Sequence, residues 1–416
     1  MSLLGELLNT LFERRYPRTG RGAGGGDDRS LPALAADILG TKGEVSGLAL
    51  AGEVLSKYNT LEDDRKLEFF TYLTTRMNID AQAVRDRLDE YEENPNEETY
   101  RAYAAAAEPP RQELIRRLNR LPNGTNALVR MRADLLRLSE RESALQALDL
   151  DFLHLFSSWF NRGFLVKRPI TWETPAHVLE KIIAYESVHS IDSWNELRRR
   201  LAPEDRRCFA FFHPSMSDEP LIFVEVALTQ GIPTSIQSLL AEDRAAIDAA
   251  DANTATFYSI SSCQAGLAGI SFGNSLIKQV AADLMAEHPG LETFVTLSPI
   301  PRLAQWLEAQ DIALDSSDPE RTRRLAAHYL TAAKSATGLP YDPVARFHLR
   351  NGAAIHAVHA GADTSENGLR TSGGAMVNYH YDLGQVEQNH ERYAATGEIR
   401  VSAEVRSLAS EVGGPV

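Results

Sequence analysis

The sequence has 416 residues, of which 43% are hydrophobic, and it carries a formal net charge of −14. This length allows two domains with substantial cores, whereas the negative charge argues against a protein that binds nucleic acid or a membrane surface by electrostatic attraction. The two cysteines stand far apart and outside any C-x-x-C pattern, so we expect no cysteine zinc site and predict no metal.

Residues 1–30 are predicted to be a flexible start of the chain. They contain a short amphipathic stretch followed by the Gly-rich linker Gly20–Ser30. They lack the continuous apolar segment of a secretory signal, and no run elsewhere is long enough to span a bilayer. We therefore expect a cytoplasmic protein with no membrane partner.

The chain up to residue 160 is predicted to be a helical bundle. Its apolar residues recur with a period of about 3.6, and prolines separate the segments. Arginines interleaved with leucines are typical of a surface helix, so we expect a structural or subunit-contact role rather than a catalytic one. The predicted helices are Leu61–Met77, Ala81–Tyr91, Glu97–Glu108, Arg111–Leu118 and Thr125–Phe160.

From about Gly163 the sequence changes to short β-rich segments, and we predict an α/β domain over residues 161–416. Cys208–Phe212 and Leu221–Leu228 read as strands, and the second is almost continuously apolar, as expected of a strand covered on both faces. His213 lies in the Pro-rich stretch between them. A histidine in such a turn is usually structural, but its place at a strand end makes it a candidate for substrate binding.

The segment Thr254–Arg302 predicts one βαβ unit. A β-branched and aromatic strand, Thr254–Ile260, leads into a Gly-bearing loop, an amphipathic helix and a second strand that ends at Ser298 and Pro299. A loop before a helix leaves backbone N–H groups unpaired, and the helix dipole favours negative charge there. The loop is therefore a candidate seat for a pyrophosphate.

Two motifs overlap in this loop. Gln264–Gly269 resembles the Q/R-x-x-G-x-G/A loop with which N-acetyltransferase (GNAT) superfamily proteins hold coenzyme A. Gly269–Gly273 matches G-x-S-x-G, the turn that presents the nucleophile Ser271 in α/β-hydrolases, and Asp342 and His348 would complete the order Ser, Asp, His. Against the second interpretation, a polar stretch separates the motif from the strand that should lead straight into it.

After Ser298 the chain returns to helix over Leu303–Gln310 and Pro319–Ser335, and a further helical turn ends at Gly352. Beyond Gly352 we expect a Gly-, Ser- and Asn-rich connection that contains Asn378–Tyr381, and then a polar helical tail. The tail from Gln385 is predicted to contribute little to the core. Since Ser298 precedes a proline, it is expected to be extended and to lie at the C-terminal end of its strand, where ligands of α/β sheets usually bind.

Four segments in this order, FYSIS-x-x-Q-x-G-L-x-G, LSPIP, FHLRNGA and M-V-N-Y-x-Y, resemble the malonyl-CoA decarboxylase family over about residues 205–382. The resemblance implies a helical domain used to form a homo-oligomer, a dimer or tetramer, and a GNAT-like α/β catalytic domain. It implies that Ser298 and His348 are the catalytic pair and that Tyr379 is their neighbour. The implied CoA-binding loop consists of Ala268, Gly269, Ile270, Ser271, Phe272, Gly273 and Asn274.

Such an enzyme releases CO2 and acetyl-CoA from malonyl-CoA, and the thioester accepts the electron pair, so we expect no cofactor beyond the CoA ester itself. Animal members of the family carry an acidic residue where this chain has Ser271, so no role for that side chain is implied. The alternatives are a thioesterase that uses Ser271, a GNAT-like acetyltransferase, and a regulatory protein that binds acyl-CoA. Only the decarboxylase would release CO2.

Overall fold

The computed structural model describes residues 28–139, 143–270, 276–315 and 317–412. Contacts within the chain group it into two compact units. The first takes the chain up to Leu128 together with Arg137–Leu148, and the second takes Val129–Leu136 together with the chain from Asp149 onward. The helix α8 (Gly124–Ser139) therefore contributes to both units. The boundary expected between residues 160 and 161 stays a prediction.

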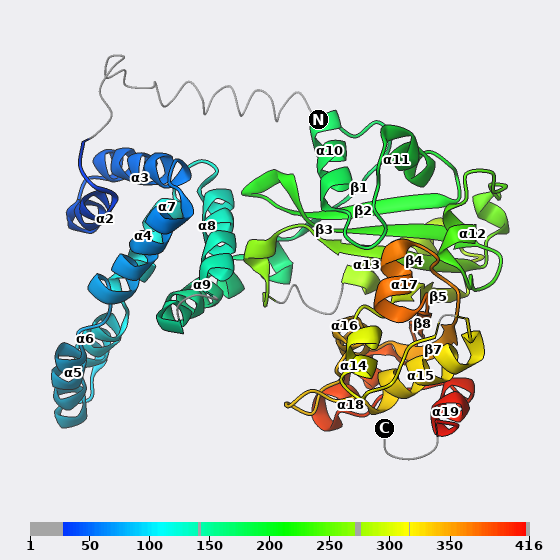
Figure 1. The fold of residues 1–416 in the computed structure, drawn as a ribbon. Helices are drawn as coiled ribbons and strands as arrows, with labels where there is room; N and C mark the ends of the chain where they lie inside the picture. Colours follow the sequence, from blue (N-terminus) through cyan, green and yellow to red (C-terminus); the bar gives the residue numbers. More distant parts are fainter. Residues whose placement is uncertain (1–27, 140–142, 271–275, 316, 413–416) are drawn as a thin grey trace. The chain divides into compact units, whose positions relative to one another are not determined.

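The first unit is helical, as predicted. Prolines and N-terminal caps set its helix ends: the Ser30 side chain caps α2, and the Asn96 side chain forms a capping box on α6. Leu34, Phe70 and Leu114 are among the residues of its core, each at most 1% exposed. Besides α8, its helices are α2 (Leu31–Gly40), α3 (Glu44–Asn59), α4 (Asp63–Arg76), α5 (Ala81–Glu93), α6 (Glu97–Ala107) and α7 (Pro110–Asn119) (Figure 1).

The predicted helix Thr125–Phe160 is wrong as a single element. The chain forms α8 and then α9 (Gln146–Trp159), with a short 3-10 turn at Ser143–Leu145 between them. The physical reason is the polar stretch between Ser139 and Ser143, which interrupts the apolar period that a continuous helix would need.

The second unit is built on an eight-stranded mixed sheet of order β1-β2-β3-β4-β5-β8-β6, with β7 paired to β8. Only β4 and β5 among these pairs are parallel, and α13 (Leu276–Glu287) connects them, which confirms the predicted βαβ unit. The strands are β1 (Val166–Pro169), β2 (Arg206–His213), β3 (Met216–Thr229), β4 (Thr254–Ser262), β5 (Thr293–Thr296), β6 (Ser298–Pro299), β7 (Ala354–His359) and β8 (Met376–His380).

Helices flank this sheet in the second unit (Figure 1). An N-terminal helical region followed by a mixed α/β domain is the fold class that the sequence predicts, and it is confirmed. These helices are α10 (Ala176–Tyr185), α11 (Trp194–Leu201), α12 (Ile236–Leu240), α14 (Leu303–Glu308), α15 (Pro319–Ala332), α16 (Pro343–Arg350), α17 (Glu366–Ser372), α18 (Val386–Thr396) and α19 (Ala403–Ser410).

Three features of the second unit differ from the predictions. The stretch expected to connect the first two strands is a tight hairpin, because β2 ends at His213 and β3 begins at Met216. The Gly-, Ser- and Asn-rich connection expected after Gly352 contains two strands, β7 and β8, which pair with each other across the intervening helix α17. The tail is not peripheral: it forms α18 and α19, which bury Val386, Tyr393, Val405 and Leu408.

No helix among the described residues is both long and apolar enough to cross a membrane.

Gly352 ends α16 with a backbone φ of +84°, and a Cβ atom at this position would lie 1.9 Å from the carbonyl oxygen of Val386. Replacing Gly352 by Ala should therefore destabilise the protein by about 3 kcal/mol, since the new methyl group meets a backbone atom of α18 that cannot easily move. Chemical denaturation measures the difference.

Gly338 is the matched control, because its φ is +77° and nothing lies within 4 Å of a Cβ atom there. Gly338→Ala should cost only about 1 kcal/mol, the price of the left-handed backbone alone. Equal losses for the two variants would show that the contact with α18 does not restrict Gly352.

Candidate active site

The site forms where the two parallel strands separate. β4 and β5 pair from Thr254 and Thr293 to Phe257 and Thr296, and the N–H of Leu297 makes a last hydrogen bond to the carbonyl of Phe257 (3.0 Å). Beyond this point β4 stays paired with β3, whereas the other chain turns into β6, where Ser298 pairs with Val377 of β8. Ser298 therefore lies at the start of the gap, as its sequence position predicts.

A cavity of about 200 Å³ occupies this region, and its lining is largely apolar. A charged group that entered it would lose water without meeting an opposite charge from the lining. The lining residues are Val188, Ile222, Phe257, Tyr258, Ile260, Ser262, Ser298, Pro299, Val344, Phe347 and His348.

Ser298 and His348 are hydrogen-bonded in this cavity, 3.2 Å apart between Oγ and Nε2. The Ser298 hydroxyl donates to Oγ1 of Thr296 (2.8 Å), so the proton of the contact with His348 belongs to Nε2. The other ring nitrogen, Nδ1, then accepts a hydrogen bond from the hydroxyl of Tyr381 at 2.8 Å. Four side chains from three distant segments thus form one chain of hydrogen bonds that sets the tautomer of His348.

The helix α16 brings His348 to the cavity. Pro343 occupies its first turn, and the Asp342 side chain caps it by accepting from the N–H of Ala345 (2.9 Å). Asp342 also accepts from the hydroxyl of Tyr329 (3.2 Å). Because both ring nitrogens of His348 already bond to Ser298 and Tyr381, Asp342 does not take the orienting position of a Ser-Asp-His triad. Ser271, the nucleophile of that alternative, lies outside the described residues.

Burial sets the charge of the site. His348 is 3% exposed, and burial lowers its pKa from 6.5 to about 3. Burial likewise raises the pKa values of Tyr379 and Tyr381 well above the ordinary value of 10. At neutral pH the imidazole is therefore neutral, so that it offers one N–H donor rather than a full positive charge.

The predicted neighbour Tyr379 does reach the pair, but by stacking. Its ring lies against that of His348 with centroids 4.4 Å apart and planes 21° apart. Its buried hydroxyl has no hydrogen-bond partner among the described residues. The hydrogen bond to the histidine comes from Tyr381 instead.

Sequence reasoning missed Thr296 and Tyr381 as site residues. Each lies two positions from a residue that it singled out, Ser298 and Tyr379, and alternate residues of a strand share a face. The backbone N–H of Tyr379 also donates to Oγ1 of Thr296 (3.1 Å), which ties β8 to the pair. The period of two was the signal that could have found both.

Of the predicted CoA-binding loop, the structure describes Ala268, Gly269 and Ile270, which follow a 3-10 turn at Ala265–Leu267. Gly269 has a φ of +79°, a conformation that favours glycine. Ser271, Phe272, Gly273 and Asn274 lie outside the described residues, so their predicted contacts stay predictions.

The structure does not bring His213 into the lining of this cavity. Its Nε2 lies 3.1 Å from the carbonyl of Trp159, its Nδ1 accepts from the N–H of Ser215 (3.2 Å), and its ring packs against Phe160. These contacts are those of a histidine that holds a hairpin in place. Its part in substrate binding stays a prediction.

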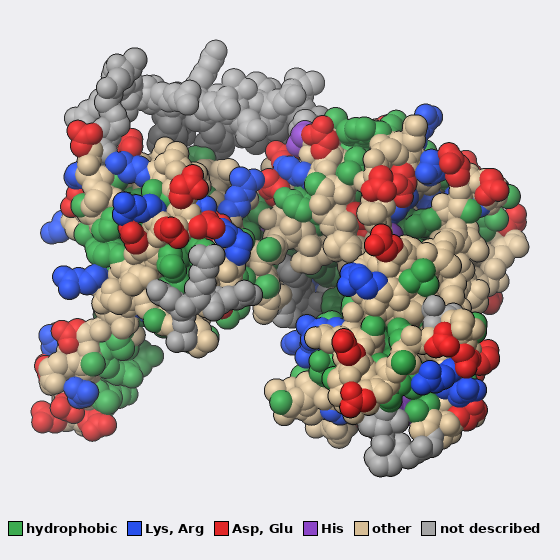
Figure 2. Space-filling view, in the orientation of Figure 1, with side chains coloured by type: hydrophobic (Ala, Val, Ile, Leu, Met, Phe, Trp, Pro, Cys, Tyr) green, Lys and Arg blue, Asp and Glu red, His purple; other side chains and the backbone are tan. Residues whose placement is uncertain are grey.

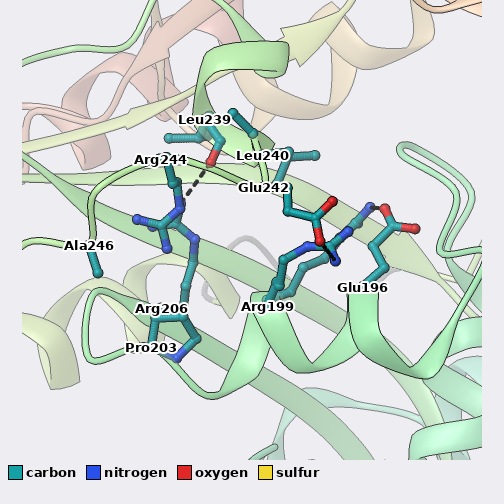
Figure 3. A pocket seen from close by; sticks show the side chains of 11 residues that line it. Glu196, Arg199, Pro203, Arg206, Leu239, Leu240, Glu242, Arg244 and Ala246 are labelled. Carbon is teal, nitrogen blue, oxygen red and sulfur yellow. Dashed lines mark hydrogen bonds and ion pairs between the residues drawn. The ribbon is translucent and has the colours of Figure 1, made fainter.

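Another pocket of about 110 Å³ lies between α11 and α12 (Figure 3). Its charged groups satisfy one another: Arg199 pairs with Glu242 (3.1 Å), and Arg206 donates to the carbonyl of Leu239 (2.7 Å). It contains no pair of groups suited to proton transfer. In the described part of the chain, no group of three or more His, Cys, Asp or Glu residues is arranged to hold a metal ion.

Comparison with protein families gives two matches. The malonyl-CoA decarboxylase N-terminal domain matches residues 77–160, and the malonyl-CoA decarboxylase C-terminal domain matches residues 163–322 and 318–413. The mitochondrial malonyl-CoA decarboxylase of Anser anser anser is 35% identical over 360 residues, 73% of this chain and 70% of the relative. That of Rattus norvegicus is 33% identical over 350 residues, 72% of this chain and 70% of the relative.

Solved structures agree with this result. The crystal structure of malonyl-CoA decarboxylase from Rhodopseudomonas palustris superposes with a TM-score of 0.86 and 46% identity, covering 91% of this chain and 98% of that one. The enzyme from Agrobacterium vitis gives a TM-score of 0.85 and 46% identity over 91% of this chain and 99% of that one.

The lowered pKa of His348, about 3, can be measured directly. Its ring nitrogen signals in an NMR spectrum, assigned by their loss in His348→Gln, should keep the neutral pattern as the pH falls from about 8 to about 5. By linkage, because the folded pKa lies below the unfolded value, this residue lowers the stability of the folded state as the pH falls through about 6.5 towards the folded pKa.

The same histidine in urea-denatured protein is the control, and it should titrate near the ordinary value of about 6.5. Titration near that value in the folded protein would contradict the buried, neutral imidazole.

Proposed function

The chain belongs to the malonyl-CoA decarboxylase family and is a carboxy-lyase that converts malonyl-CoA to acetyl-CoA and CO2, and we propose that Ser298 and His348 carry this reaction. The observation that supports the proposal is their hydrogen bond of 3.2 Å in a largely apolar cavity at the gap between two parallel strands.

The reaction breaks the bond between the carboxylate carbon and C2 of the malonyl group. The electron pair of that bond moves into the thioester, where it becomes an enolate, and CO2 leaves without charge. An apolar lining favours this movement, because it removes water from the carboxylate and leaves it no opposite charge. Fixed donors near the thioester oxygen gain strength as charge develops there, and one such donor typically contributes about 3 kcal/mol of barrier lowering.

In this proposal Ser298 binds and orients the malonyl carboxylate, and His348 delivers the proton that C2 must gain. The neutral imidazole carries that proton on Nε2, the nitrogen that faces Ser298 and the cavity. The Tyr381 hydroxyl at Nδ1 keeps this tautomer in place. As Nε2 gives its proton to C2, the Tyr381 hydroxyl passes its own proton to Nδ1, so that the imidazole stays neutral. Solvent then reprotonates Tyr381, and one proton is consumed for each acetyl-CoA formed.

We further propose that the reaction needs no metal or organic cofactor. The support is chemical: a thioester stabilises the enolate itself, so the reaction lacks the step for which other decarboxylases recruit an electron sink. The cytoplasmic location stays a prediction.

The hydrolase alternative needs a base that can activate Ser271 and an acid that orients the base. His348 already bonds to Ser298 and Tyr381, and Asp342 is committed to the N-terminus of α16 and to Tyr329. These contacts favour the decarboxylase. An acetyltransferase would in addition require an amine acceptor before any turnover.

Product analysis tests the pair. Purified protein dialysed against a chelator and supplied with malonyl-CoA should release acetyl-CoA and CO2 in equal amounts. Ser298→Ala should lower kcat by about a hundredfold, because the malonyl carboxylate loses the hydroxyl that orients it for cleavage. His348→Ala should lower it by about a hundredfold or more, because the positioned proton donor is lost.

Ser271→Ala serves as the control, and it should largely preserve the rate. If Ser271→Ala abolished the rate while Ser298→Ala left it intact, the Ser298–His348 proposal would be wrong. Activity that disappears on dialysis and returns with a metal ion would instead contradict the proposal that no cofactor is needed.

We also propose that the first unit forms a homo-oligomer through the hairpin of α5 and α6. Neither helix contains a buried residue, although both carry apolar and aromatic side chains. Leu88 is 36% exposed and Tyr100 is 58% exposed. Figure 2 shows hydrophobic side chains gathered along this hairpin, at the lower left of the view. A second copy of the chain would cover a surface that is costly to leave in water.

Light scattering after size-exclusion chromatography should show fewer subunits for the double variant Leu88→Glu with Tyr100→Glu than for the unchanged protein, because charges would then face the contact. Val45→Glu is the control, since Val45 is 78% exposed on α3, away from this hairpin in the sequence. An unchanged mass for the double variant would place the contact elsewhere.

A further inference from the structure

A buried arginine of α8 holds the loop that follows β4. Arg132 is 1% exposed, and its Nη1 donates to the carbonyl oxygens of Gly266 (2.8 Å) and Ala268 (2.9 Å). Its Nε donates to Asp149 at 2.7 Å, which balances the buried charge. A guanidinium that binds three acceptors in fixed directions is a rigid support, because each bond is charge-assisted and the group is planar.

The loop and α8 are also in direct contact. A Cβ atom on Gly266 would lie 1.8 Å from the carbonyl oxygen of Val129, one helical turn before Arg132. The residue at this position must therefore be glycine if the loop is to reach the arginine. A Cβ atom added to Gly269 would lie 3.5 Å from a methyl carbon of Leu153 in α9, which is an ordinary van der Waals distance.

The bond to the carbonyl of Ala268 has a consequence for the next residue. In a planar trans peptide, the carbonyl oxygen of one residue and the N–H of the following residue point in opposite directions. Because Arg132 draws the Ala268 oxygen towards α8, the N–H of Gly269 points away from it. Gly269 has a φ of +79°, so the chain can turn at this point without the strain that a side chain would add.

We propose that Arg132 is a positioning residue for CoA binding: from α8 it orients the Ala268–Gly269 peptide so that its N–H faces the pyrophosphate of the substrate. This inference rests on the proposed function and on the CoA-binding loop, Ala268–Asn274, that the family resemblance implies. Arg132 does not touch the reacting atoms. It acts on binding, by holding a backbone donor in place before the substrate arrives.

Arg132→Lys tests the inference, because an ammonium group keeps the charge but cannot reach both carbonyls and Asp149 in the same geometry. Two substrates separate its role from general damage: malonyl-CoA, and malonyl-pantetheine, which lacks the pyrophosphate and the adenosine. The variant should raise KM for malonyl-CoA about tenfold with kcat changed by less than about twofold. Its kcat/KM for malonyl-pantetheine should stay that of the unchanged protein.

Arg130→Lys is the matched control. It is the same substitution on the same helix, at a side chain that is 67% exposed and pairs with Glu219 (3.2 Å). This variant should leave KM and kcat unchanged for both substrates. An equal loss on both substrates for Arg132→Lys, or no loss on either, would overturn the inference.

Thermal unfolding followed by circular dichroism shows whether Arg132→Lys folds. If it does not fold, Asp149→Asn replaces it, because this change removes the carboxylate that binds Nε of Arg132 and leaves Nη1 free to donate to the loop carbonyls. KM for malonyl-CoA should then rise by less than tenfold, and kcat/KM for malonyl-pantetheine should again stay unchanged. Calorimetric titration with CoA itself tests the role of Arg132 in CoA binding separately from the proposed decarboxylase reaction. Weaker CoA binding in the variant would support the role of Arg132 even if the unchanged protein released no CO2, and unchanged CoA binding would refute it.

Discussion

The site depends on the point at which β4 and β5 stop pairing. Two neighbouring parallel strands that stay hydrogen-bonded along their length leave no space for a ligand between them. Here Leu297 makes the last hydrogen bond to β4, and the following residues turn to pair with β8. Pro299 has no N–H and cannot continue a ladder on that side. The resulting gap exposes the inner edge of the sheet and places Ser298 at its start.

The gap also decides the electrostatics. Because it opens within the sheet, its walls are strand and helix side chains such as Ile260 and Val344 rather than solvated loop residues. A histidine held among them is kept neutral, and its two nitrogens must find partners inside the protein. Ser298 and Tyr381 supply them. The proposed binding of the substrate carboxylate by Ser298 and the proposed proton transfer from His348 therefore both depend on one short chain of hydrogen bonds.

The part of α8 that belongs to the second unit contacts the loop after β4. α8 supplies Arg132, which fixes two carbonyls of the loop after β4. A helix for which the sequence predicts a structural or subunit-contact role thus shapes the backbone on which the substrate's phosphates are proposed to bind.

The sequence by itself determined most of the local structure, because local structure follows from patterns within a few residues. The period of 3.6 located α4 to α7, the β-branched run located β4, and the Ser-Pro pair placed Ser298 at a strand end. The family motifs singled out Ser298, His348 and Tyr379, and the structure brings these three together.

Only the tertiary structure decided which tyrosine bonds to the histidine, that β7 and β8 are strands, and that the polar tail packs as α18 and α19. Those facts depend on pairing between segments far apart in the chain, such as Val295 with His380, and no local pattern records which partners will meet. Arg132 is the clearest example: in the sequence it is one arginine among several on a helix, and its role follows only from the two carbonyls, more than 130 positions away, that it reaches in the folded protein.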